Sequence, residues 1–153
     1  MRIIKKLRQE IIGQTEEGKP SILSYLGNKG PKKLSKEYVA RFFDHNVYII
    51  GLGLNDQEVD LWWILCYRAY LYYSNIYNAK DLIKNRIIYY DVHGTKITQD
   101  GYSFEEDYKK QNKAKYENMR IDYIPLEVAG SNSYKDKYIE ALNMIAKDCK
   151  NND

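Results

Sequence analysis

Residues 47–54 read VYIIGLGL, and this stretch decides the fold class. The β-branched and aromatic run from Val47 to Gly51 is typical of a strand buried on both faces of a parallel sheet. A glycine-containing turn follows it, and Arg86 to Val92 is a second strand of the same kind. Residues 46–92 therefore predict a strand, a turn, a buried helix and a second strand, the βαβ core of an α/β domain.

The helix between these strands has a well-marked start. Asn55 and Glu58 fit a capping box, and the acidic residues around them suit the positive end of a helix dipole. From Val59 to Tyr73 the helix is apolar on nearly every side, so we expect it to be enclosed by the protein. Arg68 is the exception, and it either reaches back to the acidic turn at Asp60 or faces solvent.

Three further elements complete the predicted order. Phe104 to Asn118 is a polar helix, with Phe104, Tyr108 and Tyr116 inward. Ile121 to Val128 is a third strand, which Pro125 places at a sheet edge. A last amphipathic helix runs through Lys147, with its inward positions at Tyr138, Ala141, Leu142 and Ile145.

The order βαβαβα predicts a three-layer Rossmann-like half-domain, with a short parallel sheet of about three strands flanked by helices. We assign this domain to residues 47–150. Residues 1–46 are predicted to be an N-terminal extension of helix and loop, because they contain the breakers Pro20, Gly27, Gly30 and Pro31.

Composition and charge narrow the function classes. The 153 residues are 44% apolar and 29% charged, which is typical of one folded domain. The net charge of +3 with interspersed signs gives no reason to expect nucleic acid as a partner. The longest strongly apolar run, Leu61 to Tyr67, is too short to span a membrane. Cys66 and Cys149 fit neither a disulfide framework nor a zinc site, so we expect a cytoplasmic protein without a metal.

The candidate ligand site lies where the strands end. In open α/β sheets, glycines at the carboxyl ends of strands let the backbone approach a nucleotide. The turn after the first strand supplies the candidate cofactor-binding residues Gly51, Leu52, Gly53, Leu54 and Asn55. Acidic residues fill the first helical turn and would repel a phosphate. We therefore expect this turn to bind a ribose hydroxyl rather than a pyrophosphate. The alternative is that the glycines serve only a tight turn.

Asp91 and His93 follow at the end of the second strand. Asp91 resembles the acidic residue that receives a ribose in dinucleotide folds, although it could equally be a turn-forming aspartate. His93 lies at the same edge and could reach a ligand, or it could be an ordinary loop histidine. No Ser/His/Asp or Cys/His set is identifiable, so the catalytic residues stay unknown.

Residues 47–54, followed by residues 58–65 with the sequence EVDLWWIL, resemble the bacterial sirtuin-like proteins of the silent information regulator superfamily. The resemblance spans roughly Asp44 to Lys147 and corresponds to the distal half of that family's nucleotide-binding domain. It implies that the Gly51 turn looks like the sirtuin Gly-Thr-Ser segment that contacts the ribose of nicotinamide adenine dinucleotide (NAD). Tyr90 or Asp91 then looks like the family's Asn near the adenosine.

The same resemblance has large departures. Residues 1–46 contain no counterpart of the family's Gly-Ala-Gly-x-Ser loop, its catalytic histidine or its cysteine zinc module. In the family the Val47 strand is central, so here its free edge would be exposed unless residues 1–46 cover it. We therefore expect a homodimer or a partner chain at this sheet edge.

The sequence thus predicts a truncated or divergent sirtuin-like domain that is not catalytic alone and binds NAD or ADP-ribose weakly. One alternative is a protein-interaction module without a ligand, which would gain support if tyrosine or leucine side chains filled the edge of the pocket. A second alternative is a subunit of an NAD-hydrolysing enzyme that uses His93.

Overall fold

The computed structural model describes residues 13, 20–27, 38–52, 54, 58–94, 104–128 and 133–151. The chain forms two compact units. Unit 1 comprises Met1–Val47 and Leu54–Arg86, and unit 2 comprises Tyr48–Gly53 and Ile87–Asp153. The predicted domain ranges, residues 1–46 and 47–150, stay a prediction. By its contacts, the helix after the glycine turn belongs with the residues that precede the first strand.

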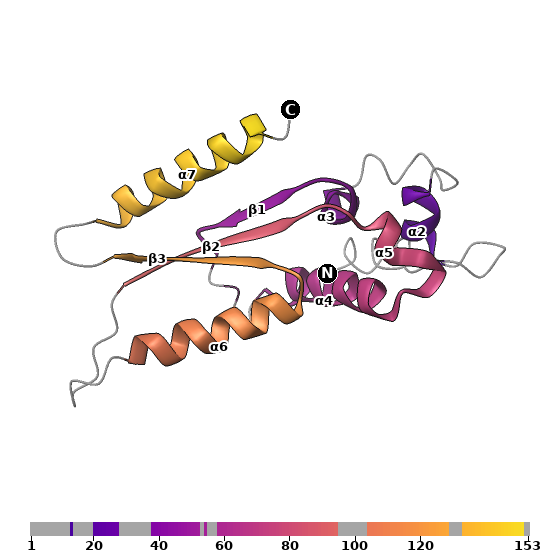
Figure 1. Cartoon of the computed structure of the whole chain (residues 1–153), viewed down its shortest axis with the longest axis horizontal. Coiled ribbons are helices and arrows are strands. Elements are labelled where there is room, and N and C mark those ends of the chain that lie inside the picture. The colour runs from indigo at the N-terminus through magenta and orange to yellow at the C-terminus, as the bar shows by residue number, and fades with distance from the viewer. Residues whose placement is uncertain are drawn as a thin grey trace. The chain divides into compact units, whose positions relative to one another are not determined.

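Unit 2 is built on a three-stranded parallel sheet in the order β1-β2-β3. The strands are β1 (Val47–Ile50), β2 (Ile87–Gly94) and β3 (Asp122–Val128). Two helices, α6 (Phe104–Asn118) and α7 (Tyr134–Asn151), cover opposite faces of the sheet (Figure 1). The predicted α/β class, with a short parallel sheet flanked by helices, is therefore confirmed. β3 is an edge strand, as Pro125 predicts.

The two faces of the sheet carry different side chains because successive residues of a strand point to opposite sides. The face toward α7 is mostly aliphatic, with a buried core of Ile88, Tyr90, Leu126 and Ala141. The face toward α6 is aromatic. There Tyr89 of β2 packs edge-on against Tyr116 of α6, with 5.1 Å between the ring centroids. Tyr116 is buried, so its predicted inward position is confirmed.

Unit 1 is mostly helical. The helices in its described residues are α2 (Ser21–Leu26), η2 (Tyr38–Ala40), α3 (Arg41–Asp44), α4 (Val59–Ser74), η3 (Ile76–Asn78) and α5 (Ala79–Leu82). They share an apolar core that includes Ile22, Leu23, Phe43, Ile64, Leu71 and Ile83. The bounds of α4 confirm the predicted helix to within a residue. The predicted capping role of Asn55 lies outside the described residues.

Arg68 of α4 is buried in unit 1, with 1% of its surface exposed, so the predicted solvent-facing position was wrong. Its Nη2 donates to the carbonyl oxygen of Asn85 at 2.5 Å and to the side-chain oxygen of Asn85 at 3.1 Å. The Asn85 amide in turn donates to the carbonyl oxygens of Phe42 and His45. Arg68 is thus part of a polar network that connects α4, the segment before β2, and α3.

Two predictions about helix faces were also wrong. α4 is not enclosed, because Val59, Cys66, Tyr70 and Tyr73 form an exposed stripe at helical spacing. On α7, Leu142 is 56% exposed, while Ala141 is fully buried. The inward arc of α7 is narrow, and Leu142 lies about 100° around the helix from Ala141. The predicted inward positions of Phe104 and Tyr108 concern side chains outside the described residues.

Candidate functional site at the carboxyl edge of the sheet

The carboxyl ends of the three strands meet the first turns of α7 at one edge of unit 2. Gly51, directly after β1, has φ +74°, a conformation that favours glycine. A Cβ on Gly51 would lie 3.5 Å from the hydroxyl oxygen of Tyr138. A Cβ on Gly94, the last residue of β2, would lie 2.9 Å from the hydroxyl oxygen of Tyr134. A Cβ at Gly51 would thus make only ordinary van der Waals contact with Tyr138, so the positive φ and not the space favours glycine there, whereas a Cβ at Gly94 would crowd the Tyr134 hydroxyl.

The predicted binding turn is divided between the two units. Gly51 and Leu52 belong to unit 2 and are exposed, while Leu54 belongs to unit 1 and is buried. Leu54 has φ +43°, and its carbonyl oxygen accepts a hydrogen bond from Trp62 Nε1 at 3.1 Å. Gly53 and Asn55 lie outside the described residues. Of the five turn residues predicted to bind a ligand, Gly51 and Leu52 are the two that the structure places at this edge.

Asp91 is a strand residue rather than a turn residue, because β2 continues to Gly94. Its carboxylate is buried on the α6 face of the sheet. Tyr123 of β3 donates a hydrogen bond to Asp91 Oδ2 at 2.7 Å. The hydroxyl of Tyr89 lies 2.9 Å from the carbonyl oxygen of Leu52 and 3.3 Å from Asp91 Oδ1. Asp91 is thus connected, through Tyr89, to the backbone of the predicted binding turn.

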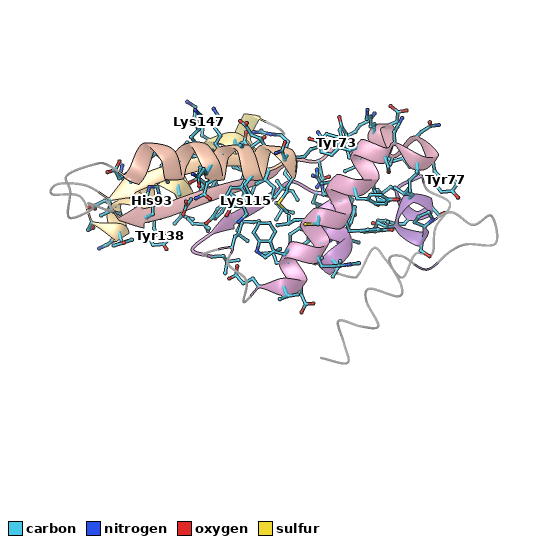
Figure 2. All side chains as sticks on the ribbon, turned by 90° about the horizontal axis from the view of Figure 1, so that it is seen from below. Tyr73, Tyr77, His93, Lys115, Tyr138 and Lys147 are labelled. Atoms are coloured by element: carbon cyan, nitrogen blue, oxygen red, sulfur yellow. The ribbon has the colours of Figure 1, made fainter. Side chains whose placement is uncertain are left out.

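His93 extends this cluster toward the end of β2, and Figure 2 labels it together with Tyr138 toward the same end of unit 2. Its Nδ1 lies 3.0 Å from the carbonyl oxygen of Asp91 and 3.7 Å from Asp91 Oδ2. The short contact with a carbonyl oxygen favours the tautomer with the proton on Nδ1, which leaves Nε2 as the acceptor nitrogen. The sequence prediction placed His93 beyond the end of the second strand, and this was wrong, because β2 continues to Gly94.

Sequence reasoning missed the two tyrosines that hold Asp91. One signal was present: Tyr89, Asp91 and His93 alternate along a strand, so their side chains share one face. Tyr123 could be found only through the register, which places it opposite Tyr89 on β3. Tyr116 of α6 completes the cluster by stacking on Tyr123 with 5.1 Å between ring centroids.

The N-terminus of α7 is already capped by its own residues. Ser133 N–H donates to Asp136 Oδ2 at 2.9 Å, and Asp136 N–H donates to Ser133 Oγ at 3.2 Å. The Ser133 backbone N–H holds the pKa of Asp136 below its ordinary value, so this carboxylate stays ionised. A negative charge and occupied N–H groups make this helix end a poor phosphate site. The edge therefore suits aromatic bases and hydroxyl groups better than anions.

Two further observations concern metal binding and membrane-spanning helices. Within the described ranges, the His, Cys, Asp and Glu side chains form no group of three or more that could hold a metal ion. None of the helices in the described part of the chain combines the length and apolar character needed to cross a membrane. A search of protein-family models, curated proteins and solved structures finds no match to the chain.

Proposed function

We propose that the chain is a sirtuin-like half-domain that binds the adenosine part of NAD and does not cleave the cofactor by itself. The observation that carries the proposal is the edge of unit 2, where the exposed Gly51 lies beside Tyr138 of α7 and Gly94 lies beside Tyr134. The motif in residues 47–54 supports the choice of cofactor, because it resembles a ribose-contacting turn. The Tyr89 hydroxyl supports the turn, because it donates to the Leu52 carbonyl oxygen at 2.9 Å, with Asp91 Oδ1 as a more distant acceptor at 3.3 Å.

The adenosine part is favoured over the phosphates for electrostatic reasons. The ionised carboxylate of Asp136 stands at the N-terminus of α7, where a phosphate would otherwise bind. Tyrosine rings, in contrast, offer a stacking surface for a purine base, and a stacked base contributes about 1–3 kcal/mol. Half of a binding site gives weak binding, so we expect affinity without turnover.

Isothermal titration calorimetry tests this proposal. We expect saturable heat with NAD and ADP-ribose and none with nicotinamide mononucleotide, which lacks adenosine. Tyr138→Ala should weaken ADP-ribose binding about tenfold through the lost stacking surface, whereas the exposed Lys115→Ala should not. Absence of heat with ADP-ribose, in protein whose circular dichroism shows it folded, would overturn the proposal. Release of nicotinamide by the chain alone, abolished by His93→Ala, would instead support an NAD-hydrolysing subunit.

A protein-interaction module is the second candidate, and one observation favours it. The positive φ of Gly51 explains this glycine without any ligand. β1 also stands at the end of the strand order, where a strand from another chain could pair with it. If the chain is such an interaction module, neither wild type nor Tyr138→Ala should give heat with ADP-ribose. Tyr48→Pro in β1 should then abolish binding of the partner chain.

A further inference from the structure

The outer face of α7 has an ordered charge pattern. Asp136 and Glu140 lie in its N-terminal half, Lys147 and Lys150 lie in its C-terminal half, and Asn143 lies between the two pairs. Their spacing of four, three, four and three residues places all five side chains in one stripe along the helix. All five residues are exposed. The stripe is therefore acidic at one end and basic at the other.

Apolar side chains border this stripe. Ile139 is 46% exposed and Met144 is 38% exposed, one on each side of Asn143. A shallow depression, wide open to solvent, follows the same face and is lined by Asp136, Ile139, Glu140, Asn143, Met144 and Lys147. Exposed apolar groups with a charged rim are typical of a protein-binding surface. The opposite face of α7, with Ala141 and Ile145, packs on the sheet.

The charge pattern specifies what binds here. We propose that the outer face of α7 pairs with the same face of a second copy of this chain, antiparallel, with the two-fold axis at Asn143. In that arrangement each acidic end faces the basic end of the other copy, and Ile139 and Met144 are covered between them. A parallel pairing would place like charges together. This face is distinct from the edge of β1 and independent of any nucleotide.

Neighbouring contacts are compatible with the pairing. Glu140 forms an exposed ion pair with Lys137 on its own helix at 2.8 Å, and such pairs exchange partners at little cost. α7 has 18 residues and is about 27 Å long, so one pair of such helices offers a small contact compared with the roughly 1,600 Å² of a standard interface. We therefore expect a weak dimer that forms at high concentration.

Charge reversal tests the pairing by analytical ultracentrifugation, over a concentration series that reaches the millimolar range. Wild type should dimerise, and Glu140→Lys or Lys147→Glu alone should weaken the dimer about tenfold or more. The double variant Glu140→Lys/Lys147→Glu should restore it, because the two charges exchange places across the two-fold axis. A matched exchange on α6, Lys113→Glu/Glu117→Lys, should leave dimerisation unchanged. A wild type that stays monomeric, or a double variant that fails to recover, overturns the proposal.

Disulfide trapping tests the register. Asn143→Cys lies next to its own copy across the axis, so it should form a covalent dimer on oxidation in a chain with Cys66 and Cys149 changed to serine. Lys113→Cys on α6 should stay monomeric under the same conditions. Equal trapping at both positions would mean random collision and would overturn the specific pairing.

Discussion

At the scale of single residues, Asp91 is the strongest test of the polar cluster. Asp91→Ala removes the acceptor for the Tyr123 hydroxyl and should lower the free energy of unfolding by about 2 kcal/mol. Asp91→Asn keeps one side-chain oxygen and should cost clearly less. Urea titrations of the three proteins measure this difference. An equal loss in both variants would show that the charge, and not the hydrogen bond, stabilises unit 2.

In unit 1, Asn85 is the residue at the centre of the polar hydrogen-bond network. Its side chain accepts from Arg68 and donates to the carbonyl oxygens of Phe42 and His45. Asn85→Ala should therefore lower the free energy of unfolding by about 3 kcal/mol, because it leaves buried groups without partners. The exposed Gln111→Ala on α6 serves as control and should change stability by less than about 0.5 kcal/mol. If the two variants unfold at the same urea concentration, the network does not stabilise the unit.

The sequence could not predict these residue-scale networks. Arg68 was expected near Asp60 or in solvent because local spacing shows only neighbours on the same helix. Its actual partner, Asn85, is 17 residues away, and only the packing of the helices brings them together. In the same way, the alternation of Tyr89 and Asp91 indicates a shared face, but the Tyr123 hydroxyl depends on the register of a third strand.

At the scale of elements, the start of α7 should respond to pH. Hydrogen bonds from Ser133 lower the pKa of Asp136 in the folded protein, so its contribution to stability is present above the ordinary value of 3.8. That contribution is lost as pH falls through the lowered pKa. Asp136→Asn keeps an acceptor oxygen but has no charge.

Urea midpoints at neutral pH and at about pH 2 measure this effect. Wild type should be more stable than Asp136→Asn at neutral pH, and the difference should vanish in acid. A difference that is the same at both pH values would show that the ionisation of Asp136 contributes nothing to the cap.

Element types and limits were predictable, whereas the faces of the helices were not. The apolar run of β1 and the long pattern of α4 are local signals, and both elements lie within a residue or two of their expected bounds. The exposure of Leu142 on α7 and of Tyr70 on α4 depends on which neighbours cover each helix. Apolar content alone does not identify the covered face. At the candidate site, the sequence located the strand ends but not the α7 tyrosines beside them.

At the scale of the whole molecule, two boundaries between the units fall at strands: one lies inside β1 and another lies directly before β2. β1 begins in unit 1 with Val47 and continues in unit 2, and β2 begins directly after Arg86. Val47 N–H donates to the carbonyl oxygen of Arg86 at 2.9 Å, and Arg86 N–H donates to Asn46 Oδ1 at 2.8 Å. Both hydrogen bonds lie within unit 1, and from these bonded residues the chain continues directly into the parts of β1 and β2 that belong to unit 2.

We therefore expect the chain to unfold in one cooperative transition. The two tryptophans of the chain, Trp62 and Trp63, both lie in unit 1, so their fluorescence follows that unit alone. Far-UV circular dichroism follows the helices of both units. The two signals should give the same urea midpoint, and Asp91→Ala in unit 2 should shift both of them equally. If the fluorescence midpoint stays fixed while the circular dichroism midpoint moves, the units unfold separately and the shared strands do not couple them.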